Sequence, residues 1–124
     1  MLDLGVQPII EMSWQHKPQP FTEEIIKMTQ MGLFVRLDAK PGKEAALEEF
    51  LKGALPLARA ETGTPVWYAL KFGPSSFAIF DAFEAEDGRA AHLNGPIAAA
   101  LMKHAGELLA KPVVIERWDV VAVK

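Results

Sequence analysis

The sequence lacks cysteine, neither sign of charge dominates it, and it has no long apolar run free of charge. Without cysteine the chain has no disulfides, no thiolate metal sites and no cysteine nucleophile, which fits a reducing cytoplasm. The 16 acidic and 13 basic residues give a net charge of −3, and no Lys/Arg cluster is suited to neutralising successive phosphates. The sequence shows neither a transmembrane run nor an export signal. We therefore expect a cytoplasmic protein that binds neither nucleic acid nor membrane.

The apolar content is sufficient for one folded domain. Half of the 124 residues are hydrophobic and 23% are charged, as in globular proteins. Residues 1–28 contain three prolines and no persistent apolar period, so we interpret them as an extension in which Thr22 caps a short helix ending near Met28. An alternative is that the natural chain begins at Met28 or Met31. The domain is predicted to span residues 31–124.

Within this domain the sequence alternates between the hydrophobic periods of strands and helices. Leu33, Val35 and Leu37 recur at every second residue, which predicts a strand. Residues 43–61 place apolar side chains at spacings of three and four, which predicts a helix with a kink or break at Pro56. The same reasoning predicts strands over 66–72 and 76–83, a short helical segment over 84–93, a helix from Pro96 to about Lys111, and a strand over 113–123. The order β-α-β-β-α-β is that of an α+β, ferredoxin-like domain with an antiparallel sheet.

The centre of the domain carries a succession of motifs. An apolar strand ends in Phe83, a short helix ends in Ala91-His92-Leu93, and Pro96 opens the next helix. In these residues the chain resembles the antibiotic-biosynthesis-monooxygenase-like family of dimeric α+β barrels, and the resemblance extends over residues 31–124. It implies small pockets between sheet and helices. It also implies oxidation of polyketide-type aromatic substrates by O₂ without metal, haem or flavin, although other relatives degrade haem.

The chain departs from this family pattern at two positions. Phe83 stands where many members have Trp, and Ile97 stands where many have a His directly after the helix-opening proline. Haem-degrading relatives also carry an Asn on the first strand, and no Asn lies between Met31 and Lys40. The resemblance therefore supports the scaffold more strongly than a particular active site, and it argues against haem degradation.

His92 and His104 are the candidate catalytic residues. Imidazole exchanges protons near neutral pH, so His92 is a candidate base for removing a proton from a phenolic substrate. The alternative is that His92 packs the junction of two helices. His104 lies on the apolar stripe of the last helix, where a partly buried histidine held by one hydrogen bond is common, and it is the weaker candidate.

The candidate substrate-binding residues are Trp67, Tyr68, Phe83, Arg36 and Asp81. Trp67 and Tyr68 are neighbours on one strand, so only one of them faces the helices. Aromatic walls suit a flat ligand, although aromatic residues in strands also form cores. Arg36 and Asp81 are charges on apolar strands, and we expect them to pair with each other or with a partner chain, or to anchor a substrate.

No cofactor is predicted, because the three histidines lack metal-ligand spacing and no glycine-rich nucleotide or phosphate loop is present. The leading hypothesis is a cofactor-independent monooxygenase-like protein that deprotonates a small aromatic or quinol-type substrate. His92 would be the base, in a pocket bordered by Trp67, Tyr68 and Phe83. The rival hypothesis is a non-catalytic dimeric module that binds a small apolar ligand or a partner chain.

Dimerisation through the sheet faces follows from the apolar pattern. The strand over 76–83 is nearly all apolar, as in a sheet covered on both faces, but helices in this topology cover only one face. A second copy packed around a two-fold axis covers the other face. Equilibrium sedimentation at micromolar concentration should therefore give about twice the chain mass of 13.6 kDa, and a monomer would contradict the inference.

Overall fold

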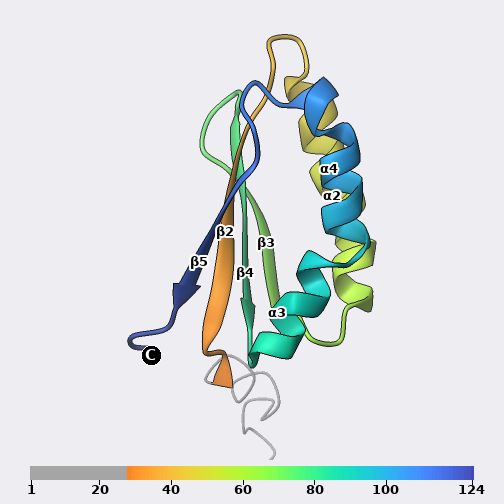
Figure 1. The fold of residues 1–124 in the computed structure, drawn as a ribbon. Coiled ribbons are helices and arrows are strands. Elements are labelled where there is room, and N and C mark those ends of the chain that lie inside the picture. Colours follow the sequence, from red (N-terminus) through yellow and green to blue (C-terminus); the bar gives the residue numbers. More distant parts are fainter. Residues whose placement is uncertain (1–27) are drawn as a thin grey trace, which may run out of the picture.

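The fold is given by a computed structural model, which describes residues 28–124 (Figure 1). The predicted N-terminal extension and its Thr22-capped helix lie outside the described residues, except for Met28. In chain order the elements are β2 (Met31–Asp38), α2 (Glu44–Ala60), β3 (Val66–Lys71), β4 (Ser76–Phe83), α3 (Glu86–Leu93), α4 (Pro96–Leu108) and β5 (Val114–Asp119). The strand order is β3-β4-β2-β5, and all neighbouring strands are antiparallel. This is the predicted ferredoxin-like arrangement, with α3 as an additional short helix.

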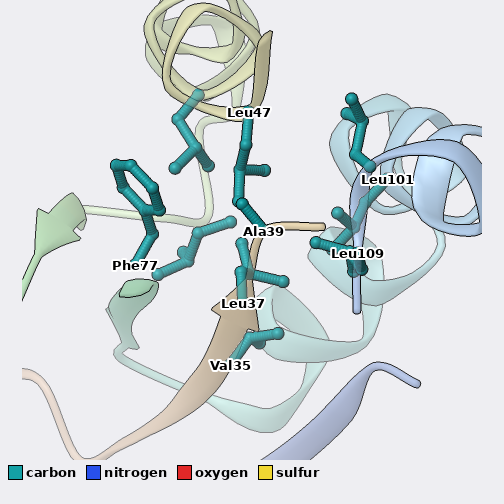
Figure 2. Close-up of a cluster of buried hydrophobic side chains, with 10 residues drawn as sticks. Val35, Leu37, Ala39, Leu47, Phe77, Leu101 and Leu109 are labelled. Atoms are coloured by element: carbon teal, nitrogen blue, oxygen red, sulfur yellow. The ribbon is translucent and has the colours of Figure 1, made fainter. Parts of the chain in front are cut away.

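The helices form one layer on a single face of the sheet (Figure 1). Strand alternation turns every second residue of β2 and β4 toward this layer, where α2 and α4 add their apolar stripes. Figure 2 shows the resulting core, in which side chains from β2, β4, α2 and α4 meet. Its members include Val35, Leu37, Phe77, Leu47 and Leu101. Within residues 28–124 no helix is long and apolar enough to cross a bilayer.

The helices α2 and α4 and the strand β5 differ in extent or continuity from the sequence prediction. The break expected at Pro56 is absent, because α2 continues to Ala60 and both Pro56 and Lys52 lie on its exposed side, where water can solvate the carbonyl that lost its partner. Helix α4 begins at Pro96 as predicted but ends at Leu108, since Leu109 leaves the helix to form a bridge with Ala39. β5 is shorter than the predicted strand over 113–123.

The sheet face opposite the helices carries interlocked aromatic rings. The Trp118 ring stacks on Phe80 at a centroid distance of 5.0 Å, and Tyr68 meets Phe80 edge-on at 6.4 Å. Trp118 also crosses directly over Gly32, because no side chain at that position obstructs the indole. The face is therefore apolar at its centre, while Tyr68 remains 58% exposed at its margin.

The Gly32 position provides a test of this packing. A Cβ atom at Gly32 would overlap the Trp118 indole and the backbone oxygen of Asp81, so Gly32→Ala should lower the free energy of unfolding by about 1–3 kcal/mol. A matched control is Gly53→Ala in α2, where no atom lies within 4 Å of the new Cβ, and this change should stabilise by about 1 kcal/mol. Urea unfolding measures both values. Equal stability of Gly32→Ala and the wild type would refute the packing of Trp118 over Gly32.

Candidate functional site

His92 is buried between two carboxylates. Its Nε2 atom lies 2.9 Å from Oδ2 of Asp81, and its Nδ1 atom lies 2.6 Å from Oε1 of Glu61. The Thr64 hydroxyl donates a hydrogen bond to the same Glu61 oxygen over 2.8 Å. The side chains of His92, Asp81 and Glu61 are 7%, 1% and 15% exposed. We refer to Glu61, Asp81 and His92 as the carboxylate–histidine cluster.

Three separate elements bring this cluster together. Asp81 lies on β4 opposite Leu33 of β2, and strand alternation directs both side chains toward the helices. Glu61 directly follows α2, and His92 lies in the last turn of α3. The fully buried Phe83 of β4 packs beside the imidazole, with 5.5 Å between ring centroids. The cluster therefore ties α3 and the end of α2 to the sheet.

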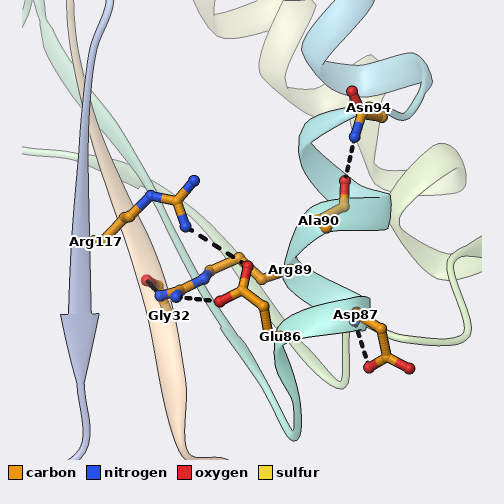
Figure 3. A network of polar contacts seen from close by, with 8 residues as sticks. Gly32, Glu86, Asp87, Arg89, Ala90, Asn94 and Arg117 are labelled. Atoms are coloured by element: carbon orange, nitrogen blue, oxygen red, sulfur yellow. Dashed lines mark hydrogen bonds and ion pairs between the residues drawn. The ribbon is translucent and has the colours of Figure 1, made fainter.

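A second polar network holds α3 against the strands (Figure 3). Arg89 is buried, pairs with Glu86 and donates a hydrogen bond to the carbonyl oxygen of Gly32 over 3.4 Å. Arg117 of β5 lies 3.7 Å from the other carboxylate oxygen of Glu86. These contacts fix the start of α3 against β2 and β5, and so they help to set the position of His92 at its end.

Burial and neighbouring charges act in opposite directions on His92. Burial alone would lower the pKa of the imidazole, but its contacts with Asp81 and Glu61 outweigh burial and raise the pKa of His92 from 6.5 to about 8. Burial raises the pKa of Asp81, the Glu61 charge adds to the rise, and His92 opposes it. At neutral pH the imidazole is therefore protonated and donates through both ring nitrogens. In this state it has no lone pair with which to accept a substrate proton.

A small cavity reaches the cluster where α2, α3 and α4 meet. Its volume is about 260 Å³, and besides Glu61 and His92 it is lined by Ala60, Thr62, Gly63, Thr64, Gly88, Ala91, Gly95 and Pro96. The backbones of Gly63 and Gly88 lie so close together that a Cβ atom on Gly88 would be 2.6 Å from the backbone oxygen of Gly63. Oε2 of Glu61 is buried and has no hydrogen-bond partner. We call this space the Glu61 cavity.

A larger and more apolar cavity lies between α2 and β3. Its volume is about 350 Å³, and its lining consists of Leu51, Leu55, Trp67, Ala69, Leu70 and Phe77 with Glu48, Lys52 and Lys71. Nζ of Lys71 lies 2.8 Å from one Glu48 oxygen, and Nζ of Lys52 lies 3.5 Å from the other. Trp67 stands directly opposite Asp81 in the β3–β4 ladder. We call this space the Trp67 cavity. Through the pairing of Trp67 with Asp81, its wall adjoins the carboxylate–histidine cluster.

The structure separates the predicted aromatic residues. Trp67 packs toward the helices, whereas Tyr68 lies on the open face, as the alternation predicts. Tyr68 borders a hollow of about 240 Å³ together with Val66, Leu70 and Phe80. Phe83 is enclosed in the core. The prediction of one pocket bordered by Trp67, Tyr68 and Phe83 is therefore wrong.

Of the alternatives expected for Arg36 and Asp81, pairing with each other within one subunit does not occur. Arg36 lies opposite Ala78 on the open face, where its guanidinium donates to the Ser76 hydroxyl over 3.2 Å and stacks over the Phe72 ring at 4.5 Å. Asp81 points to the other face and pairs with His92. Because strand alternation assigns the two charges to opposite faces, they cannot meet within one subunit.

His104 lies on α4 and packs against Phe50 of α2. It is half-buried, and its ring meets Phe50 edge-on at 5.9 Å. It lines neither the Glu61 cavity nor the Trp67 cavity. Among residues 28–124 no group of three or more metal-ligating side chains is suited to holding a metal ion.

Sequence reasoning did not identify Glu61 or Thr64. The segment Thr62-Gly63-Thr64-Pro65 indicated only a turn, and Glu61 only the end of a helix. The available signal was Asp81, because a carboxylate on an apolar strand requires a cation. His92, rather than Arg36, lies on the helix layer that Asp81 faces.

The pKa of His92 makes stability depend on pH. Because its folded-state pKa is raised, the cluster contributes its full stabilisation below pH 6.5 and loses it as the pH rises through about 8. The raised pKa of Asp81 acts in the same direction. From a rise of 6.5 to about 8 we expect the free energy of unfolding to fall by about 2 kcal/mol between pH 6 and roughly pH 9.

Urea unfolding at fixed protein concentration across this pH range measures the fall. In the His92→Asn variant the free energy of unfolding should change much less between pH 6 and pH 9, because asparagine does not titrate. A wild-type stability that stays constant, or rises, from pH 6 to 9 would show that the imidazole is not held as a cation between the two carboxylates.

Comparison with known proteins places the chain in a family. No family model and no curated protein sequence matches it. Among solved structures, a protein of unknown function from Nitrosomonas europaea is 63% identical, with a TM-score of 0.76 over 78% of this chain and 94% of that chain.

Two proposed antibiotic biosynthesis monooxygenases share the fold at lower identity. The one from Nitrosomonas europaea is 17% identical, with a TM-score of 0.67 over 74% of this chain and 99% of its own. The one from Deinococcus radiodurans is also 17% identical, with a TM-score of 0.67 over 76% and 95%. Two proposed monooxygenases thus share the fold of this chain, and the chain belongs to one family with the Nitrosomonas europaea protein of unknown function.

Proposed function

We propose that the protein is a cofactor-independent monooxygenase-like protein that binds a small aromatic or quinol-type substrate in the Trp67 cavity. The observation that carries the proposal is an apolar, aromatic-walled cavity of about 350 Å³ with two ammonium groups among its lining residues. This volume lies within the usual range for small-ligand sites, and the rings of Trp67 and Phe77 suit a flat substrate. The shared fold supports the oxygenase assignment only by analogy.

The charged lining supplies the electrostatics that oxidation by O₂ needs. A phenol or quinol gives up an electron far more easily as its anion. The ammonium groups of Lys52 and Lys71 would stabilise that anion and so lower the pKa of the bound hydroxyl, whose proton leaves to solvent. The substrate supplies all four electrons that reduce O₂. One oxygen atom forms a C–O bond in place of a ring C–H bond, and the other leaves as water with two hydrogens of the substrate, so that a quinol ends as the hydroxyquinone.

In this proposal His92 acts through its neighbours rather than on the substrate. It does not line the Trp67 cavity, and its ring nitrogens are engaged by carboxylates. It holds Asp81, the cross-strand neighbour of Trp67, and thereby supports the cavity wall. His92 is thus a positioning residue, whereas Lys71 is the residue that contacts the substrate anion.

The second candidate is a non-catalytic, dimeric small-ligand-binding module. It is favoured by the ion pairing of Glu48, Lys52 and Lys71, because each titratable group that lines the Trp67 cavity is already held by a partner. The aromatic open face suits the sheet-to-sheet homodimer that both candidates require. The two candidates differ in whether a bound quinol consumes O₂.

Oxygen uptake separates them. With a chelator present, single-ring and two-ring quinols should bind in a thermal-shift assay. At least one should consume O₂ and give a product that, by mass spectrometry, has gained one oxygen atom and lost two hydrogen atoms. Lys71→Met should lower kcat/KM about tenfold or more, from the loss of a charge-assisted hydrogen bond of roughly 1.5–3 kcal/mol. Lys111→Met is the matched control, since Lys111 is exposed and makes only a 3.8 Å ion pair with Asp38.

Binding without oxygen uptake would establish the ligand-binding module instead. If no quinol binds, or if Trp67→Ala leaves the affinity unchanged, the Trp67 cavity is not the site and both candidates fail.

A further inference from the structure

An ion pair joins the two walls of the Trp67 cavity. Nζ of Lys71, at the end of β3, lies 2.8 Å from Oε1 of Glu48 on α2, and both residues line the cavity. The same ammonium lies 5.6 Å from the centre of the Phe77 ring, which is also part of the lining. The cation that the proposed function assigns to the substrate anion is thus bound by a carboxylate of the protein itself.

Neither member of this ion pair is buried. The side chain of Lys71 is 52% exposed and that of Glu48 is 35% exposed, so a ligand can reach the ammonium and the carboxylate has room to turn away. Glu48 also has a second partner on its own helix, because its Oε2 atom lies 3.5 Å from Nζ of Lys52. It keeps this partner when it releases Lys71. Since exposed ion pairs are weak, a ligand anion can displace the carboxylate.

The lining of the cavity carries a net positive charge. It contains the ammonium groups of Lys52 and Lys71 and one carboxylate, that of Glu48, while its remaining residues are uncharged. The hydrogen bond from Lys71 lowers the pKa of Glu48, so this carboxylate is ionised at neutral pH and competes for Lys71 as an anion. One negative charge on a ligand balances the charge of the lining.

We propose that Glu48 is a specificity-determining residue of the Trp67 cavity: it competes with the ligand for Lys71 and yields the ammonium only to an aromatic ligand that carries a negative charge. A neutral ring leaves the ion pair in place, and a cation on the ring is repelled by Lys71. The cavity therefore selects flat anions over neutral and cationic molecules of the same shape. The inference rests on the proposed function for the location of the ligand, and it adds the charge class of that ligand.

Three naphthalene derivatives of similar shape and different charge test the inference: naphthoate, naphthalenemethanol and naphthylmethylammonium, substituted at the same ring position. The cavity volume of about 350 Å³ admits two fused rings. Each probe is titrated into the full-length protein at neutral pH, and the backbone amides of Ala69 and Lys71 in the cavity wall are followed by ¹H–¹⁵N NMR. Naphthoate should bind most tightly, the alcohol more weakly and the ammonium most weakly.

Two variants assign the roles of the charged residues. Glu48→Gln keeps the shape of the side chain and removes its charge, so naphthoate should bind about two- to fivefold more tightly, as expected for the loss of one exposed competing ion pair. The same change should leave the affinity for the alcohol unaltered and weaken that for the ammonium. Lys71→Met should weaken naphthoate binding about tenfold, because it removes a charge-assisted hydrogen bond. Opposite changes for the anion and the cation cannot come from a loosened structure.

Glu49→Gln is the matched control. It removes the same charge from the next position of α2, and Glu49 lies 3.6 Å from Nζ of Lys52 but does not line the cavity. Its affinities for the three probes should equal those of the wild type. Equal tightening of naphthoate binding in Glu48→Gln and Glu49→Gln would overturn the role of Glu48, because a general loss of negative charge would then explain both.

The remaining outcomes separate this inference from the proposed function. Equal affinities of the wild type for the three probes would overturn the charge selection, and unchanged naphthoate affinity in Glu48→Gln would overturn the competition for Lys71. If no naphthalene derivative binds although quinols do, the inference fails alone. None of these titrations involves O₂, so a lack of oxygen uptake with quinols contradicts the oxygenase and leaves the charge selection standing.

Discussion

The position of the helix layer depends on one buried acid. Asp81 lies on the most enclosed strand, and an ionised carboxylate there costs several kcal/mol unless a cation and hydrogen bonds compensate. His92 provides that compensation from α3, and Glu61 secures the other side of the imidazole from the end of α2. The need of Asp81 for a cation thereby holds α3 and the end of α2 against the sheet. These elements also form part of the walls of the two cavities that flank the cluster.

Much of the fold was predictable because it follows from local periodicity. The alternation of Leu33, Val35 and Leu37 and the helical stripe of residues 43–61 each specify both an element and its buried face. The helix does not break at Pro56, because a proline on the exposed side of a long helix leaves the carbonyl that lost its hydrogen bond open to solvent. The prediction failed at the end of α4 because the bridge from Leu109 to Ala39 is a tertiary contact.

The site was less predictable because it is made of contacts between distant segments. His92 was identified from its chemistry, but its partners come from positions 31 and 11 residues earlier in the chain, on elements whose packing no local pattern specifies. Arg36 could be offered as one possible partner of Asp81 only because the charges were matched without following which sheet face each side chain takes. Which residues surround the two cavities, and hence their opposite chemical character, follows only from the packed structure.

The crossing of Trp118 over Gly32 has a consequence for association through the open face. The indole lies over the glycine and flat on Phe80. The rings of Tyr68, Phe80 and Trp118, from three different strands, therefore contact one another and cover this part of the face. Interlocked rings have few rotamers left to lose, and a surface of this kind gives up little conformational entropy when another apolar surface covers it. By leaving room for the Trp118 indole, Gly32 of β2 thus lowers the loss of side-chain entropy on association through this face.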